Sequence, residues 1–185
     1  MRISSPAAED SPYFLPDGEL VFRAIEGGSN YLYRMRTDGS ERKKISPERI
    51  LDIFDVSPDG RWVAVAVPGS GDEEHINLGR TKAFEVDGTA TVTVCAGYCL
   101  LNWDTSGGFV YLSYPMAGGM NYPFPVMRDS ELPKLPSVEA TRIEDFGNLK
   151  DKTAIPWQVE SAVNPTVYAY TRQNARRNLY RIQLP

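Results

Sequence analysis

The chain has 185 residues, of which 42% are hydrophobic and 24% charged, values that fit one globular domain and exclude a largely disordered chain. Its net charge of -4 argues against nucleic acid or an anionic membrane as the main partner. No apolar run approaches the roughly 18 residues that span a bilayer, and the first ten residues lack the apolar segment of a secretory signal.

The first unit, residues 11–46, is predicted to form four short strands separated by turn residues. Tyr31, Tyr33 and Met35 alternate with polar or smaller residues, which places the three side chains on one face of a strand. Asp38-Gly39 is typical of a hairpin turn. The expected strands are Pro12–Leu15, Glu19–Ala24, Tyr31–Arg36 and Arg42–Ile45.

The second unit, residues 47–95, repeats this pattern. Trp62 opens a run of valine and alanine that suits a buried strand, and Asp87-Gly88 is a second hairpin turn. The polar, acidic loop between its second and third strands, residues 68–79, is expected to be exposed. The expected strands are Ile50–Ser57, Trp62–Val67, Thr81–Val86 and Ala90–Val94.

The third unit, residues 96–136, is expected to begin with the strands Leu100–Asp104 and Phe109–Tyr114. Its later half is rich in proline, which removes hydrogen-bond donors, so this part is expected to be edge strand or extended loop. Residues 137–149 form an insertion in which one or two helical turns are expected. The fourth unit, residues 150–185, is expected to contain the strands Thr153–Val159, Thr166–Arg172 and Asn178–Leu184.

One turn recurs in these units and defines the repeat. In Ser57-Pro58-Asp59-Gly60, proline presets φ and glycine takes the position of positive φ. The same turn occurs 42 residues earlier around Asp17 and returns in degraded form around Asp104, 45 residues later, and around Asn164. A period of roughly 40–45 residues with four strands per unit is that of propeller blades. The sequence therefore predicts an all-β propeller of about four antiparallel blades in one domain, residues 1–185.

The motif Ser-Pro-Asp-Gly-Arg-Trp-Val-Ala-Val, together with Leu-Tyr-Arg-Met-Arg-Thr-Asp-Gly-Ser-Glu, resembles the TolB-type, WD-repeat-like propeller family. The C-terminal segment is also similar to the end of bacterial propeller regions attached to serine/threonine kinase-like or winged-helix regulators. This resemblance implies a sensing or binding scaffold and brings no catalytic residue with it. Since such propellers have six to eight blades, it also implies that this chain is the C-terminal part of a larger protein or a shortened relative.

The fourth unit shows three strands, because Arg177–Gln183 matches the third strand of the first unit, Asn30–Arg36, in its Leu-Tyr-Arg. An unpaired strand edge is an aggregation hazard. We therefore expect Arg2–Ser5 to pair beside Leu179–Leu184 and to close the fold, or else an open edge that recruits another chain.

Cys95 and Cys99 flank a predicted turn between the second and third units. Cysteines four residues apart across a tight turn can come within disulfide distance. Three hypotheses remain for the two cysteines: a disulfide, two small buried thiols, and a metal site that would need further ligands.

Other candidate groups have plain structural explanations. A catalytic triad would have to use the one histidine, His75, which lies in the acidic loop. Asp72, Glu73 and Glu74 lack the spacing of a calcium loop. Trp62, Trp103 and Trp157 are expected to anchor the core, with stacking on a ligand as the alternative. Four arginines near the end are either an anion or partner contact or charges that protect strand edges: Arg172, Arg176, Arg177 and Arg181.

The sequence thus favours a non-catalytic binding or sensing scaffold with no cofactor, no metal and an unidentified protein or small-molecule ligand. The alternative is an accessory domain of a larger enzyme, either a kinase receptor or a prolyl-peptidase-type hydrolase, whose catalytic part lies outside this chain. Such a protein would add further blades or a kinase-like domain. Localisation stays open: cytoplasmic for a whole chain, extracytoplasmic for the C-terminal part of a membrane receptor.

Overall fold

The structure of the chain is a computed structural model. Every strand in the described part of the chain belongs to an antiparallel sheet, and that part includes no helix long and apolar enough to cross a membrane. The structure describes residues 9–69, 79–95, 97–113, 121–126, 154–155, 159–161 and 168–170.

The first sheet has four strands in chain order, and Glu19–Glu26 pairs over its whole length with the strand that follows it. The turn glycines Gly18 and Gly39 both have positive φ, as the sequence predicted for Asp-Gly turns. The strands are β1 (Glu9–Phe14), β2 (Glu19–Glu26), β3 (Ser29–Arg36) and β4 (Lys43–Lys44).

The second sheet repeats the same order, and its strand β6 is buried over all six residues, which explains its unbroken run of apolar side chains. Its four strands agree with the expected ones to within about two residues at each end. They are β5 (Asp52–Val56), β6 (Trp62–Val67), β7 (Arg80–Glu85) and β8 (Thr91–Cys95).

The third and fourth units contain fewer strands within the described residues. The third sheet has the order β11-β10-β9, and Asn121 of the proline-containing β11 also forms a bridge with Ile155 on the side away from β10. Within the expected strand Thr153–Val159, Ile155 forms an antiparallel bridge with Asn121, and Val159 begins β12. Four full blades and a closed ring therefore remain predictions. The strands are β9 (Leu100–Trp103), β10 (Phe109–Ser113), β11 (Asn121–Pro125), β12 (Val159–Ser161) and β13 (Tyr168–Tyr170).

Three expectations fall outside the described residues. They are the helical turns in 137–149, the strand Asn178–Leu184, and the pairing of Arg2–Ser5 with that strand.

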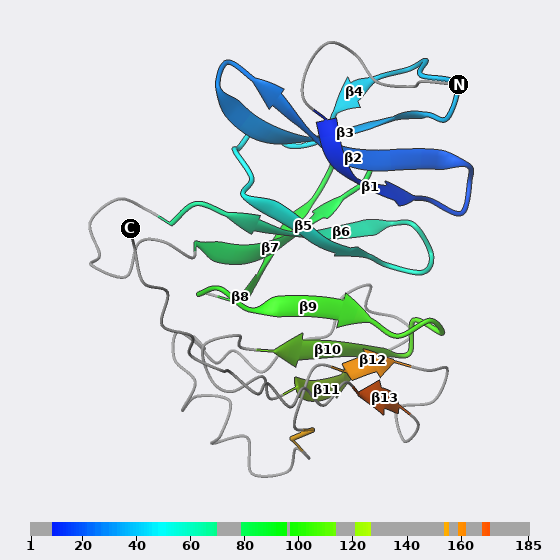
Figure 1. The fold of residues 1–185 in the computed structure, drawn as a ribbon, viewed down its shortest axis with the longest axis vertical. Coiled ribbons are helices and arrows are strands. Elements are labelled where there is room, and N and C mark those ends of the chain that lie inside the picture. Colours follow the sequence, from blue (N-terminus) through cyan, green and yellow to red (C-terminus); the bar gives the residue numbers. More distant parts are fainter. Residues whose placement is uncertain are drawn as a thin grey trace, which may run out of the picture.

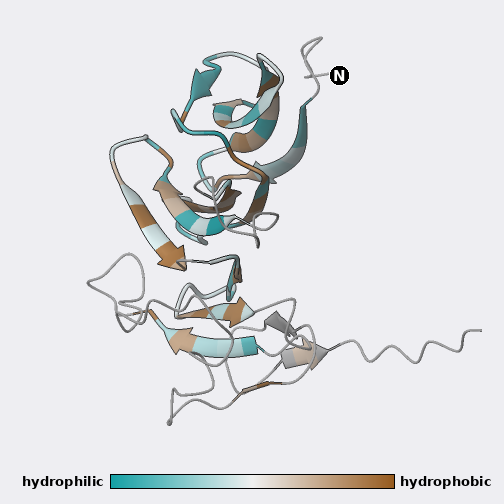
Figure 2. Cartoon of the chain, turned by 90° about the vertical axis from the view of Figure 1, so that its left-hand side faces the viewer, coloured by the Kyte–Doolittle hydropathy of each residue, from teal (hydrophilic) through white to brown (hydrophobic). Residues whose placement is uncertain are grey.

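The first three sheets follow one another along the long axis of the molecule (Figure 1). Apolar residues recur within the strands of each (Figure 2). One core lies between the first and second sheets and includes Val21, Leu32, Val63 and Val65. A second core lies between the second and third sheets. It contains Trp62, Ala64, Ala83, Cys95, Cys99, Leu101, Trp103, Val110, Leu112 and Phe124. Both expected tryptophan anchors within the described residues are therefore core residues.

The turn of the second sheet is held by a short chain of side-chain hydrogen bonds. The Ser57 hydroxyl donates to the Asp59 carboxylate at 2.5 Å and accepts from the backbone N–H of Trp62 at 2.8 Å. Asp59 also accepts from the Arg61 N–H at 3.0 Å. Gly60 has a φ of 74°, as predicted. These bonds satisfy the polar groups that a tight turn exposes.

The third sheet builds the same turn with the two residue types exchanged. The Ser106 hydroxyl donates to Asp104 at 2.5 Å, and Asp104 accepts from the Phe109 N–H at 2.9 Å. Asp104 therefore occupies the place of Ser57, and Ser106 the place of Asp59. The sequence alignment that matched Asp104 with Asp59 is wrong, because the backbone bonds and not the residue type define the equivalent positions.

Candidate functional site

β1 and β5, which are the first strands of the first and second sheets, lie in contact and carry a group of charged side chains. Arg23, on the neighbouring strand β2, reaches across both of them. Its Nε and Nη2 donate to the two carboxylate oxygens of Asp10 at 2.6 and 2.7 Å. Its Nη1 donates to the Leu51 carbonyl oxygen and lies 3.7 Å from Asp52 Oδ1. We call Asp10, Arg23 and Asp52 the first-strand rim.

The carboxylates of the first-strand rim remain accessible to solvent. The side chains of Asp10 and Asp52 are 57% and 52% exposed, whereas that of Arg23 is 22% exposed. Each guanidinium nitrogen of Arg23 already donates one hydrogen bond, so the guanidinium tethers the two sheets, and the carboxylates form the polar surface that a ligand would meet. Two carboxylates against one cation leave the rim with a net negative charge.

Two further hydrogen bonds connect the first strands of neighbouring sheets, one between β1 and β5 and one between β5 and β9. The Tyr13 hydroxyl donates to the Phe54 carbonyl oxygen at 2.9 Å. Asp55 Oδ2 accepts a hydrogen bond from the backbone N–H of Trp103 at 2.7 Å, which links the second sheet to the third. Burial, together with the charges of Asp55 and Asp52, raises the pKa of Tyr13, so this hydroxyl keeps its proton and its role as a donor.

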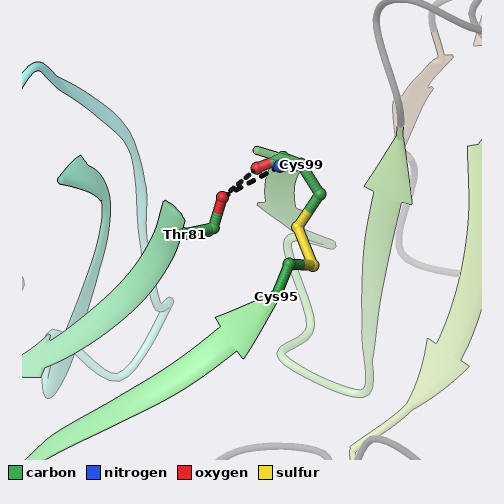
Figure 3. Close-up of a disulfide and its surroundings, with 3 residues drawn as sticks. All are labelled: Thr81, Cys95 and Cys99. Atoms are coloured by element: carbon green, nitrogen blue, oxygen red, sulfur yellow. Dashed lines mark hydrogen bonds between the residues drawn. A yellow bond between two sulfur atoms is a disulfide. The ribbon is translucent and has the colours of Figure 1, made fainter. Parts of the chain in front are cut away.

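The next connection between sheets is the loop that contains both cysteines. Cys95 and Cys99 are joined by a disulfide with a Cα–Cα distance of 6.2 Å, and both side chains are buried. The buried Thr81 hydroxyl donates to the Cys99 carbonyl oxygen at 2.6 Å and accepts from the Cys99 N–H at 3.0 Å (Figure 3). The loop is thus fixed at both ends, and β9 begins at a defined position beside the second sheet.

The remaining sequence candidates are not brought to this surface within the described residues. The acidic loop with Asp72, Glu73, Glu74 and His75 lies outside them, as does Trp157. The anion or partner contact proposed for the C-terminal arginines also lies outside them: Arg172, Arg176, Arg177 and Arg181. Among the residues that the structure does describe, no three metal-ligating side chains form a group that could hold an ion.

Sequence reasoning missed Asp10, Arg23, Asp52 and Thr81. Arg23 carried a usable signal, because it is the one charge inside the otherwise apolar segment Leu20–Ile25. A charge in such a strand must find a partner or reach solvent. Its partners, however, lie 13 and 29 positions away in the chain, so the signal marked the residue without naming its contacts.

Comparison with protein-family models and with curated proteins found no match. Solved structures with a similar course of the chain include TolB from Acinetobacter baumannii, at 15% identity and a TM-score of 0.48, over 62% of this chain and 29% of that one. Another is a putative TolB from Agrobacterium tumefaciens, at 12% identity and a TM-score of 0.49, over 60% and 40%. A third is an acylaminoacyl peptidase, at 15% identity and a TM-score of 0.44, over 63% and 24%. This chain spans less than half the length of each.

The tie between Asp10 and Arg23 should make stability depend on pH. The hydrogen bond from Arg23 lowers the pKa of Asp10, so its stabilisation is present above the unfolded pKa of about 3.9 and is lost as pH falls through the lower folded value. We expect Asp10→Asn to be less stable than the parent at pH 7 by no more than about 1 kcal/mol, because the pair is partly exposed. Urea unfolding at pH 7 and at acid pH measures the difference; one that does not shrink in acid would contradict the assignment.

Proposed function

We propose that the protein is a propeller-type binding scaffold that takes up its ligand at the first-strand rim. The observation that carries this proposal is that exposed carboxylates sit on strands that are fixed to one another by specific hydrogen bonds. A surface held in this way loses little conformational freedom when a ligand binds, so the free energy of each contact goes into affinity. The ligand is a protein or a small molecule.

Affinity purification with charge-reversal variants tests this function. The parent chain and the variants Asp10→Lys and Asp52→Lys are immobilised in equal amounts and exposed to an extract of the source cells. We expect at least one component that the parent retains and both variants lose. Glu41→Lys is the matched control, since the Glu41 side chain is 58% exposed and its salt bridge to Arg36 lies at the other end of the first sheet. This control should retain the same component.

Two results would contradict the scaffold function. One is identical retention by the parent and by both rim variants while circular dichroism shows all of them folded. The other is turnover of peptide or ester substrates by the purified chain, which would make it an enzyme in its own right.

The alternative, an accessory domain of a larger enzyme, is favoured by one observation. Phe14, at the end of β1, is 72% exposed, although it lies beside the buried Leu20. A large aromatic side chain in this position suits contact with a further part of a protein.

A further inference from the structure

The last strand of the second sheet, β8, lacks the features that usually protect the edge of a sheet. Edge strands are kept from pairing with other chains by short length, by lysine or by proline. In the first sheet β4 has two residues, both lysine, and in the third sheet β11 contains two prolines and bridges to Ile155. By contrast, β8 has five residues, Thr-Val-Thr-Val-Cys, with no charge and no proline.

The outer side of β8 is open to solvent. One side of the strand pairs with β7, and within the described residues no strand pairs with the other side. Thr91, Val92 and Thr93 are all exposed, and Val92, an apolar residue, is 41% exposed. In the described part of the chain, β8 therefore offers backbone groups and an apolar side chain to an added strand.

The hydrogen bonds of the β7–β8 hairpin define which backbone groups of β8 point outward. The Glu85 N–H donates to the Ala90 carbonyl oxygen, so these two residues form a hydrogen-bonded pair. Along an antiparallel ladder such pairs alternate with pairs that are not hydrogen-bonded. Thr91 and Thr93 occupy the alternate positions of the register, so their N–H and C=O groups point away from β7. Val92, between them, directs its own backbone groups at β7.

A β-bulge limits the straight part of this edge. The register shifts between the pair Thr81–Cys95 and the pair Lys82–Thr93, so Val94 is an extra residue in β8. The disulfide of Cys95 fixes the strand just beyond the bulge. The edge that can accept a strand is thus short and held in place, and it loses little conformational freedom on pairing.

A second copy of β8 complements this edge. In an antiparallel pair centred on Val92, Thr91 of each copy lies opposite Thr93 of the other, and the two Val92 side chains face each other. Of the antiparallel registers, this one pairs every outward-pointing N–H and C=O group of the two threonines. Threonine lies opposite threonine and valine opposite valine, which are favourable cross-strand pairs, and no charge of β8 is covered.

We propose that the outer edge of β8 is an interface between two copies of this chain, formed by antiparallel pairing of Thr91–Thr93 about a two-fold axis at Val92. The second sheets of the two copies then form one continuous sheet. Because each copy uses the same edge, assembly stops at the dimer. The association is weak, since so short a strand buries less than the roughly 1,200 Å² of a standard interface. It does not depend on what the first-strand rim binds.

Disulfide cross-linking tests the register, because both native cysteines are in the disulfide and an introduced cysteine is the one free thiol. Side chains directly opposite have Cβ atoms about 4.5–5.5 Å apart, whereas diagonal neighbours are about 7–8 Å apart. Val92→Cys therefore sets two thiols face to face in the dimer, and Thr91→Cys, its matched control, leaves them diagonal. With glutathione disulfide as the oxidant, Val92→Cys should form the covalent dimer about tenfold faster. Equal rates at equal protein concentration would overturn the proposal.

Sedimentation equilibrium measures the association itself. Between about 10 µM and about 1 mM, the average mass of the parent should rise from that of one chain toward that of two. Val92→Lys should weaken the association at least about tenfold, because it places two ammonium groups face to face. Ile25→Lys is the matched control: Ile25 is 47% exposed on the first sheet, and this variant should associate as the parent does.

Two results of the sedimentation experiment would overturn the proposal. One is a parent chain that stays monomeric at about 1 mM. The other is a folded Val92→Lys variant that dimerises as tightly as the parent, since the contact would then lie elsewhere. If circular dichroism shows that Val92→Lys is unfolded, the two cross-linking rates decide.

Discussion

Replacing Gly60 by valine should lower the free energy of unfolding by about 3 kcal/mol. Two effects add at this position. A φ of 74° places a β-branched residue in a strained backbone conformation, and the new Cβ would lie 2.5 Å from the rigid ring of Pro16. Urea unfolding followed by tryptophan fluorescence measures the loss, since Trp62 begins the strand that leaves this turn.

Gly18→Val is the matched control for that experiment. Gly18 has a similar φ of 84°, but a Cβ there would meet no atom of the described residues within 4 Å. Its substitution should therefore show the backbone strain alone, about 1–2 kcal/mol. If both variants lose the same stability, the contact between Pro16 and Gly60 contributes nothing to the stability of the fold.

Replacing Asp104 by alanine should cost about 2–4 kcal/mol, because its buried carboxylate accepts from the Phe109 N–H and from the Ser106 hydroxyl. Both donors would lose this acceptor. The exchange Asp104→Ser with Ser106→Asp should restore most of the loss, because the second sheet builds the same turn with serine first and aspartate second. Denaturant unfolding of the parent, the single variant and the exchanged pair gives the three values.

The exchanged pair distinguishes a shared turn geometry from a coincidence of residue types. A pair that is as unstable as Asp104→Ala would show that the third turn needs its carboxylate at the first position. The two turns would then not be interchangeable, and the equivalence of Asp104 with Ser57 would be wrong.

The strands and turns of the first two sheets could be predicted from the sequence because their signals are local. Pro58 and Gly60 fix backbone dihedrals within a few residues, and the run of apolar residues from Trp62 is buried on both faces, as such runs are in central strands. The burial of Trp62 and Trp103 followed from the same pattern.

The tertiary structure alone decided the contacts between sheets. Tyr13 and Phe54 are 41 positions apart, and Asp55 and Trp103 are 48 apart, so no local pattern joins them. The same holds for the first-strand rim and for the tie from Thr81 to Cys99. For the two cysteines the sequence left disulfide, thiols and metal open, whereas the structure joins them beside that tie. The physical reason is that each sheet positions its own backbone through local bonds, while the stacking of sheets brings together side chains from separate repeats.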